Sequence, residues 1–316
     1  MRDVLRRLVA GELSEDDALA ELRQMQLDEL GGRARLDLGR YLRRGIPEVV
    51  MATGKSPQEA ARLVVAMAER QGQGLISRMT GAHESALREK ARHAGMQVAE
   101  YHAAARVLRE NFSAEPMDAK VGILTAGTSD LPVADEARMV VEACGLQARL
   151  EADLGVAGLH RFVGPLAAVL EWGADVIVVA AGMDGVLPGL VAGLIELPVI
   201  GLPVSTGYGR GGAGEAALTT MLQSCSTGLT VVNIDNGVGA GAAAALIAAR
   251  AAQGRRRGRT TATTAMTSAP TTSSRNTTAV KRARSGPPGS AKTSASTKTV
   301  SKVPTNSHGK PRRLRP

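Results

Sequence analysis

The stretch AKVGILTAGTSDLPVADEARMVVEACGLQARL, residues 119–150, has the pattern of a strand, a loop, a helix and a second strand. AKVGILTAG is an apolar run that ends in glycine, and LPVADEARMVVEACGL has the spacing of an amphipathic helix. The alternation continues to about residue 251, with further strands expected in ADVIVVAAG, PVIGLPV and LTVVNID. Continuously apolar strands that alternate with helices predict a parallel sheet covered on both faces.

Five strands in this order predict a flavodoxin-like, three-layer α/β domain over residues 116–251. In such sheets ligands bind beyond the carboxyl ends of the strands. The loops that follow the expected strands are therefore the places to look for chemistry.

Residues 1–115 have the pattern of a small α+β module. Ser56, Pro57 and Glu59 in GKSPQEAARLVVAMAERQG have the spacing of a helix start. Short strands are expected near Arg35–Leu38 and Gly74–Ile76, and the run AARVLRE fits either a strand or a helix. No chemistry is assigned to this module, and an oligomerisation or lid role is the expectation.

Basic side chains gather at one end of the chain. Of its 39 Lys and Arg residues, 15 lie from position 252 onward, where there is no Asp or Glu. The first 251 residues therefore hold 24 basic and 30 acidic side chains, so the net charge of +9 conceals an acidic body. The segment 252–316 is rich in Thr, Ser, Pro and Gly, and we expect a disordered tail. It either contacts polyanions or only solubilises the protein, and no specific nucleic-acid binding is expected.

The sequence favours a cytoplasmic protein without membrane contact. No run reaches the roughly 18–20 apolar residues that cross a bilayer. The start, MRDVLRRLVAGELSEDDALAEL, mixes charges at helical spacing and lacks the apolar block of a signal peptide. Two cysteines in 316 residues supply no disulfide framework.

The loop TAGTSD follows the first expected strand of the α/β domain. Thr128 and Ser129 offer hydroxyls, and Asp130 can cap the next helix. Backbone N–H groups at such a helix start can cradle phosphate, but a plain helix cap explains the loop equally well.

Three later loops also carry polar residues. In AAGMDGVLPG, Asp184 is a lone carboxylate that is either a cap or a site residue. PVSTGYGRGG is either an anion-contacting loop or a solvated glycine loop. Turn and cap chemistry alone explains the polar residues of NIDNGVGAG. The polar residues of the second loop are Ser205, Thr206, Tyr208 and Arg210.

The two cysteines have different surroundings. Cys144 lies near the end of an expected helix, where a buried structural thiol is expected. Cys225 lies at the end of another expected helix, between Ser224 and Ser226. A nucleophilic thiol needs partial exposure and polar partners, but the negative end of a helix dipole does not favour a thiolate. From the residues alone, Cys225 is either a nucleophile or a core residue.

Several segments together resemble one family. They are VGILTAGTSDLPVADEA, DLGVAGLHR, VIVVAAGMDGVLPGLV, PVIGLPVSTGYG and LQSCSTGLTVVNIDNGVGAG, with RRGIPEVVMATGKSPQE nearer the N-terminus. Over about residues 35–250 the chain resembles the LarB family, the pyridinium-3,5-biscarboxylic acid mononucleotide synthases of nickel-pincer cofactor biosynthesis. The C-terminal domain also resembles PurE, the aminoimidazole ribonucleotide carboxylase and mutase.

One departure separates the two resemblances. Ser129 and Asp130 match a Ser-Asp pair of PurE, but the catalytic histidine of its AHLPG motif corresponds to Val186 in GVLPG. The purine-pathway proton transfer therefore lacks its acid-base group, which favours LarB and assigns a task to Cys225.

The LarB resemblance implies carboxylation of the pyridinium ring of nicotinic acid adenine dinucleotide and hydrolysis of its phosphoanhydride. The co-substrate is carbon dioxide or bicarbonate, no organic cofactor is implied, and Mg²⁺ is implied without named protein ligands. A homo-oligomer is expected, because PurE-like domains assemble as octamers. The alternatives are a PurE-type carboxylase or mutase and a non-enzymatic nucleotide-binding or tail-driven scaffold.

The resemblance also implies roles for side chains. Cys225 would add to the ring, and Asp184, where the family often has Glu, would move the ring proton or position carbon dioxide. Ser129 and Asp130 would hold the ribose-phosphate or carboxylate end. The other candidate substrate contacts are Thr128, Ser205, Thr206, Tyr208, Arg210, Asp153 and His160.

Overall fold

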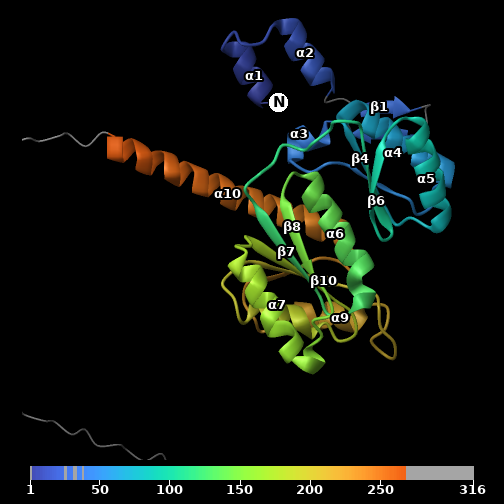
Figure 1. The fold of residues 1–316 in the computed structure, drawn as a ribbon, viewed down its shortest axis with the longest axis vertical. Helices are drawn as coiled ribbons and strands as arrows, with labels where there is room; N and C mark the ends of the chain where they lie inside the picture. The colour runs from blue at the N-terminus through green and yellow to red at the C-terminus, as the bar shows by residue number, and fades with distance from the viewer. Residues whose placement is uncertain (1, 25–26, 31–33, 38, 268–316) are drawn as a thin grey trace, which may run out of the picture. The chain divides into compact units, whose positions relative to one another are not determined.

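The computed structural model describes residues 2–24, 27–30, 34–37 and 39–267 (Figure 1). The expected disorder of the tail beyond position 267 lies outside these residues. In the described part of the chain, no helix has the length and apolar character that a membrane crossing needs.

The C-terminal domain is built on a five-stranded parallel sheet with the order β11-β10-β9-β7-β8. This is the flavodoxin-like order, so the predicted fold class is confirmed. The strands are β7 (Lys120–Thr125), β8 (Gln147–Glu151), β9 (Val176–Ala181), β10 (Val199–Pro203) and β11 (Leu229–Val231).

Helices cover both faces of this sheet (Figure 1). Side chains alternate between the faces, so that Val178 packs toward α6 and α10 while Ile177 and Val179 pack toward the other helices. One face carries α6 (Leu131–Ala143) and α10 (Gly237–Thr267), and the other carries α7 (His160–Glu171), α8 (Val186–Ala192) and α9 (Glu215–Leu222). Two short 3-10 turns, η1 (Thr128–Asp130) and η2 (Val156–Gly158), follow β7 and β8.

A polar cluster closes the amino edge of the sheet at β7 and β9. Asp175 accepts a hydrogen bond from the Lys120 backbone N–H at 2.8 Å and forms an ion pair with Arg255 of α10. The Lys120 ammonium donates to the Trp172 carbonyl at 2.9 Å and lies 5.2 Å from the centroid of its ring. Helix α10 therefore continues past position 252, where we expected the tail to begin. The guanidinium group of Arg255 attaches this part of the helix to the amino edge of the sheet.

The N-terminal domain contains a four-stranded mixed sheet with the order β3-β4-β6-β5. Helices α4 and α5 pack together, and α4 lies on the sheet with Leu63, Val64 and Met67 buried. Ser56 caps α4 by accepting from the Glu59 N–H, as predicted. The elements are β3 (Val49–Met51), α4 (Pro57–Gln71), β4 (Gln73–Ser77), α5 (Gly81–His93), β5 (Gln97–Tyr101) and β6 (Ala104–Leu108), so the run AARVLRE contributes a strand.

Smaller elements precede this sheet. Helices α1 and α2 pack through Val4 and Ala18, and Ser14 accepts from the Asp17 N–H at the start of α2. They are α1 (Arg2–Val9), α2 (Glu15–Gln24), the antiparallel pair β1 (Leu27–Leu30) and β2 (Ala34–Asp37), and α3 (Arg40–Arg44).

The two domains share one apolar core, in which Leu75 and Tyr101 of the N-terminal sheet join the side of α6 that carries Val140. Polar contacts border it: the Gln73 amide donates to the Ala143 carbonyl at 3.0 Å, and the Tyr101 hydroxyl donates to Glu142 at 2.5 Å. The N-terminal sheet therefore rests on the same helix whose start borders the expected site.

Candidate functional site

A pocket of about 580 Å³ opens at the carboxyl edge of the five-stranded sheet. It is lined by residues of the segments 126–130, 155–157, 181–187 and 206–208, which follow β7, β8, β9 and β10. This is the location predicted from the strand and helix pattern. Its volume lies within the range of pockets that bind small molecules and cofactors.

Asp130 is the most constrained polar group in the pocket. Its carboxylate accepts from the Thr206 hydroxyl at 2.6 Å and from the Gly127 N–H at 2.9 Å, and the residue is only 3% exposed. Burial raises the pKa of Asp130, while the hydrogen bonds from Thr206 and from the Gly127 and Gly182 amides oppose that rise. The expectation that Asp130 caps the next helix is wrong, because its side chain makes no capping bond to α6 and turns into the pocket instead.

The backbone at Gly182 and the backbone at Thr206 lie close together, and this holds Thr206 beside the Asp130 carboxylate. A Cβ atom on Gly182 would lie 2.2 Å from both the carbonyl oxygen and the hydroxyl of Thr206. The Thr206 carbonyl can therefore accept from the Met183 N–H at 2.9 Å. A glycine at the end of β9 is what allows the two loops to meet.

Three further predicted residues line the pocket: Ser129, Asp184 and Tyr208. Asp184 is exposed, and its carboxylate accepts a long contact from the Val186 N–H at 3.5 Å. Tyr208 is 82% exposed at the rim. Val186 itself lines the pocket, so the position of the PurE histidine faces this cavity with an apolar side chain.

Other predicted residues flank the pocket without lining it. The Ser205 N–H donates to the Asp235 carboxylate at 2.8 Å, and Asp153 accepts from Arg161 at 2.9 Å. The three that remain are exposed: Thr128, His160 and Arg210.

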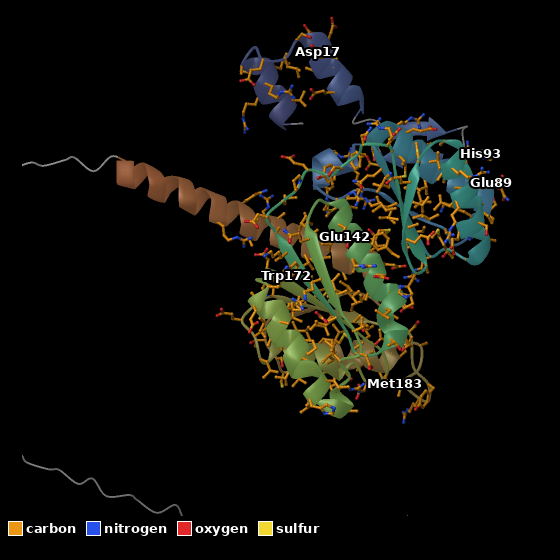
Figure 2. The ribbon with its side chains drawn as sticks, viewed as in Figure 1. Asp17, Glu89, His93, Glu142, Trp172 and Met183 are labelled. Carbon is orange, nitrogen blue, oxygen red and sulfur yellow. The ribbon has the colours of Figure 1, made fainter. Side chains whose placement is uncertain are left out.

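Cys225 lies at the opposite edge of the same sheet. Helix α9 ends at Leu222, so the thiol lies three residues beyond the helix, in the segment that leads into the amino end of β11. The Ser226 hydroxyl next to it donates to the Gly189 carbonyl at 2.7 Å. Cys225 is exposed, so it is no core residue, and a single chain does not bring it to the pocket. Figure 2 shows the two edges through Trp172 at the amino end and Met183 at the carboxyl end.

Cys144 is the buried structural thiol that was predicted. It is 1% exposed, and burial raises its pKa to about 12.

The described residues form no group of three or more His, Cys, Asp or Glu that could hold a metal ion. Both carboxylate oxygens of Asp130 already accept hydrogen bonds. The described residues therefore supply no multi-residue protein cage for Mg²⁺.

A set of residues between the domains was missed in the sequence. Arg78, at the end of β4, contacts both Glu136 of α6 and the carbonyl of Asp235. One signal was present: Glu136 falls three residues after Val133 and four before Val140, on the buried face of its helix. The partner in the N-terminal domain had no signal, because 58 residues separate the two.

The comparisons with known proteins cover both domains. A family profile described as LarB/PurE-like N-terminal domain matches residues 27–111, and one described as AIR carboxylase matches residues 120–268. An uncharacterized protein of Methanocaldococcus jannaschii is 36% identical over 251 residues, 78% of this chain and 96% of that protein. The N5-carboxyaminoimidazole ribonucleotide mutases of Thermotoga maritima and Pyrococcus horikoshii are 31% and 32% identical over 40% of this chain, and 74% and 71% of their own length is covered.

The parallel sheet, the pocket at its carboxyl edge and these matches define a carboxylase- or mutase-type enzyme of the AIR carboxylase-like superfamily. The mutases match less than half of the chain, whereas the two profiles together account for both domains. The chain belongs to the LarB family, whose C-terminal domain is PurE-like.

Proposed function

We propose that this enzyme carboxylates the pyridinium ring of nicotinic acid adenine dinucleotide and hydrolyses its phosphoanhydride in nickel-pincer cofactor biosynthesis. The products are pyridinium-3,5-biscarboxylic acid mononucleotide and AMP. The observation that carries the proposal is Val186 in the pocket lining, at the place of the PurE histidine. A pocket with an apolar side chain there lacks the group that moves a proton in the purine reaction, so another reactive group is required.

The pocket offers groups suited to the polar ends of the substrate. Ser129 and Thr206 present hydroxyls, and Asp130, the residue directly before α6, lines the cavity, so a helix start that favours a phosphate borders it. Arg210, exposed near the pocket, supplies a cation. Asp130 orders Thr206 and so fixes the phosphate side of the site.

Carboxylation requires an electron-poor ring to become a nucleophile. In the proposed step the Cys225 thiolate adds to the ring carbon beside C5, and the electron pair of the broken π bond neutralises the ring nitrogen. The resulting enamine attacks carbon dioxide through C5, and Asp184 accepts the proton from that carbon. Expulsion of the thiolate then restores the aromatic ring. In the hydrolytic step water attacks phosphorus of the anhydride, and AMP leaves.

This chemistry needs a second copy of the chain, because Cys225 and the pocket lie at opposite edges of one sheet. Both edges expose large apolar side chains, which is typical of protein interfaces. Met183 and Tyr208 are 50% and 82% exposed at the pocket, and Leu194 and Leu222 are 60% and 64% exposed toward the cysteine edge. We therefore propose a homo-oligomer in which one copy supplies the pocket and another copy supplies the thiol. We also propose, from the sequence, that the protein is cytoplasmic.

A product assay tests the reaction. The protein is incubated with nicotinic acid adenine dinucleotide and ¹³C-bicarbonate, with and without Mg²⁺, and small products are analysed by mass spectrometry. AMP and a labelled dicarboxylated mononucleotide are expected together. The mutases among the relatives favour a PurE-type reaction as the alternative; turnover of an aminoimidazole ribonucleotide with no change in the dinucleotide would overturn the proposal.

Mixed oligomers test the sharing of the site. Cys225→Ser and Asp184→Ala are each expected to be inactive alone, because each removes a different part of one site. Co-refolding the two variants should restore part of the activity, since some pockets then meet an intact thiol. If the mixture stays inactive while native-gel shifts show that the copies have mixed, the thiol does not act across copies.

A further inference from the structure

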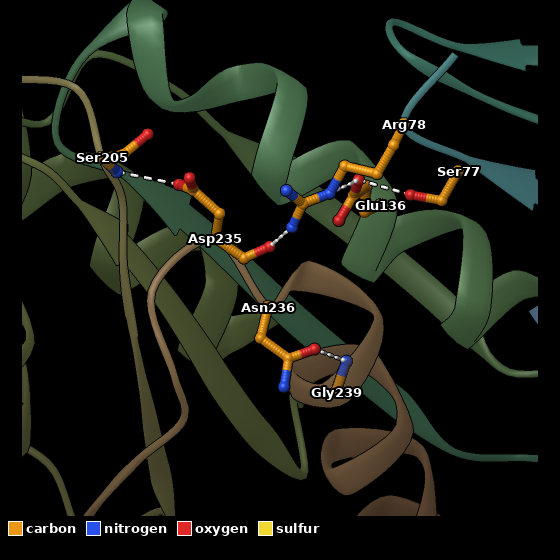
Figure 3. Close-up of polar contacts among 7 residues, drawn as sticks. All are labelled: Ser77, Arg78, Glu136, Ser205, Asp235, Asn236 and Gly239. Carbon is orange, nitrogen blue, oxygen red and sulfur yellow. Dashed lines mark hydrogen bonds and ion pairs between the residues drawn. The ribbon is translucent and has the colours of Figure 1, made fainter. Parts of the chain in front are cut away.

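The N-terminal domain reaches the loops of the pocket through one arginine. Arg78 follows β4, and its Nε donates to a Glu136 oxygen at 3.1 Å while its Nη2 donates to the backbone carbonyl of Asp235 (Figure 3). The Ser77 hydroxyl donates to the same Glu136 oxygen. A single guanidinium therefore joins α6 to the turn between β11 and α10.

Glu136 keeps the guanidinium in this place. Its side chain is only 4% exposed, and its second carboxylate oxygen is buried without a hydrogen-bond partner in the described part of the chain. Burial raises the pKa of Glu136, and the contacts with Ser77 and Arg78 oppose that rise. A buried carboxylate needs a paired cation, so removal of Arg78 would leave it with Ser77 alone.

Asp235 passes the contact on to the pocket. Its N–H donates to the Pro203 carbonyl at 2.8 Å, and its carboxylate accepts from the Ser205 N–H at 2.8 Å. Thr206, the next residue, lines the pocket and donates to Asp130. The segment 203–206 is therefore held by Asp235 on one side and by Asp130 on the other.

Two strained backbone positions meet in this contact. Arg78 has φ +61° and Asp235 has φ +55°, in the left-handed region that side-chain-bearing residues adopt only rarely. Such conformations persist where the surroundings determine them, and they gather at functional sites. Neither residue lines the pocket, so any effect of this contact on a bound ligand has to pass through the loop next to them.

We propose that Arg78 is a positioning residue: through Asp235 it fixes the Ser205–Tyr208 loop, so that the N-terminal domain sets the ligand side of the pocket. The effect on turnover rests on the proposed function, but the effect on the loop does not. The N-terminal domain is then part of the site's support, in addition to its packing on α6.

Amide hydrogen exchange of the full chain tests the loop directly. Arg78→Ala is expected to speed exchange of the Ser205 amide by about tenfold or more. The reason is that Asp235, whose carboxylate accepts from the Ser205 N–H, loses the charged hydrogen bond from Arg78 that holds it in place. Arg106→Ala is the matched control. Arg106 also lies in the N-terminal sheet and joins the domains by donating to the Glu142 carbonyl at 3.4 Å. It donates to Gln73 of its own sheet at 2.8 Å, and within the described part of the chain it has no hydrogen bond with Asp235. Unchanged exchange at Ser205 in Arg78→Ala, or an equal rise in Arg106→Ala, would overturn the proposal.

Kinetics then separate positioning from general loosening. In the product assay Arg78→Ala should raise KM about tenfold or more with a smaller change in kcat, and Arg106→Ala should leave both near wild type. Arg78→Lys, which keeps a charge beside Glu136 but cannot span both partners, should give an intermediate KM. If the alanine variant does not fold, the lysine variant decides by the same two measurements. If wild type does not turn over the dinucleotide, the proposed function fails, while Ser205 exchange still decides the role of Arg78.

Discussion

The two edges of the five-stranded sheet differ in how their reactive groups are held. At the carboxyl edge Asp130 is buried and fixed by Thr206 and two backbone amides. At the amino edge Cys225 is exposed on a segment outside any helix or strand. Groups that bind and orient a ligand gain from rigidity, whereas a thiol that acts on a neighbouring copy, as we propose for Cys225, has to be reachable. The same division separates the two cysteines, since Cys144 is enclosed in the core.

The largest expected effect separates the cysteines by activity. Cys225→Ser should lower carboxylation by about 10⁴-fold or more, because an alcohol at neutral pH does not replace a thiolate nucleophile. Cys144→Ser should retain activity once its lower stability is allowed for. The measurement is the rate of labelled product formation. Full carboxylation by the Cys225 variant would remove the thiol from the mechanism.

Alkylation should separate them by accessibility. At pH 8 iodoacetamide should modify Cys225 about 10³-fold faster than Cys144, whose thiol is buried with a pKa raised to about 12. Peptide mapping after timed quenching gives both rates. In urea above the unfolding midpoint the two rates should converge, and a difference that persists there would mean that burial is not its cause.

A methyl group at the carboxyl edge should break the contact between its loops. Gly182→Ala places a Cβ against Thr206, which should cost about 1–3 kcal/mol of unfolding free energy and weaken ligand binding. Gly164→Ala in α7 is the control, because nothing lies within 4 Å of its added Cβ, and it should gain about 0.5–1 kcal/mol. Urea unfolding measures both variants, and equal stabilities would contradict the close approach.

The smallest effect concerns the charge on Asp130. Because folding raises the pKa of Asp130, its carboxyl group stabilises the folded state below pH 3.8, the ordinary pKa of the group. This contribution to the free energy of unfolding is lost as the pH rises through the raised pKa. Asp130→Asn avoids that loss, so the variant should resist urea slightly better than wild type at pH 7 while it binds substrate less well. The gap should close at pH 3.5, and a gap independent of pH would show that ionisation of the buried carboxyl group is not its cause.

Much of the fold could be predicted from the sequence, because its determinants are local. The apolar runs and helix caps, such as Ser56 before α4, follow from neighbouring residues. The loops at the strand ends were located in the same way, and Asp130, Asp184, Thr206 and Tyr208 meet in one pocket.

What the sequence did not predict depends on contacts between distant segments. The side chain of Asp130 bonds to Thr206, 76 residues away, and not to the helix start that local spacing favours. Arg78 and Asp235 are 157 residues apart, and no periodic pattern links them. The separation of Cys225 from the pocket follows from the direction of α9, which runs from the carboxyl edge to the amino edge before β11 begins.

The contact between Lys120 and Trp172 at the amino edge gives the protein an optical reporter. Trp172 is the only tryptophan in the chain, and two phenylalanines and three tyrosines are the other aromatic residues except histidine. The fluorescence emission of Trp172 should therefore report unfolding and changes in structure at the amino edge of the sheet. It should respond little to a ligand in the pocket at the opposite edge. With so few aromatic rings, the chain absorbs weakly near 280 nm, so the absorbance of an adenine nucleotide can be followed against a low protein background.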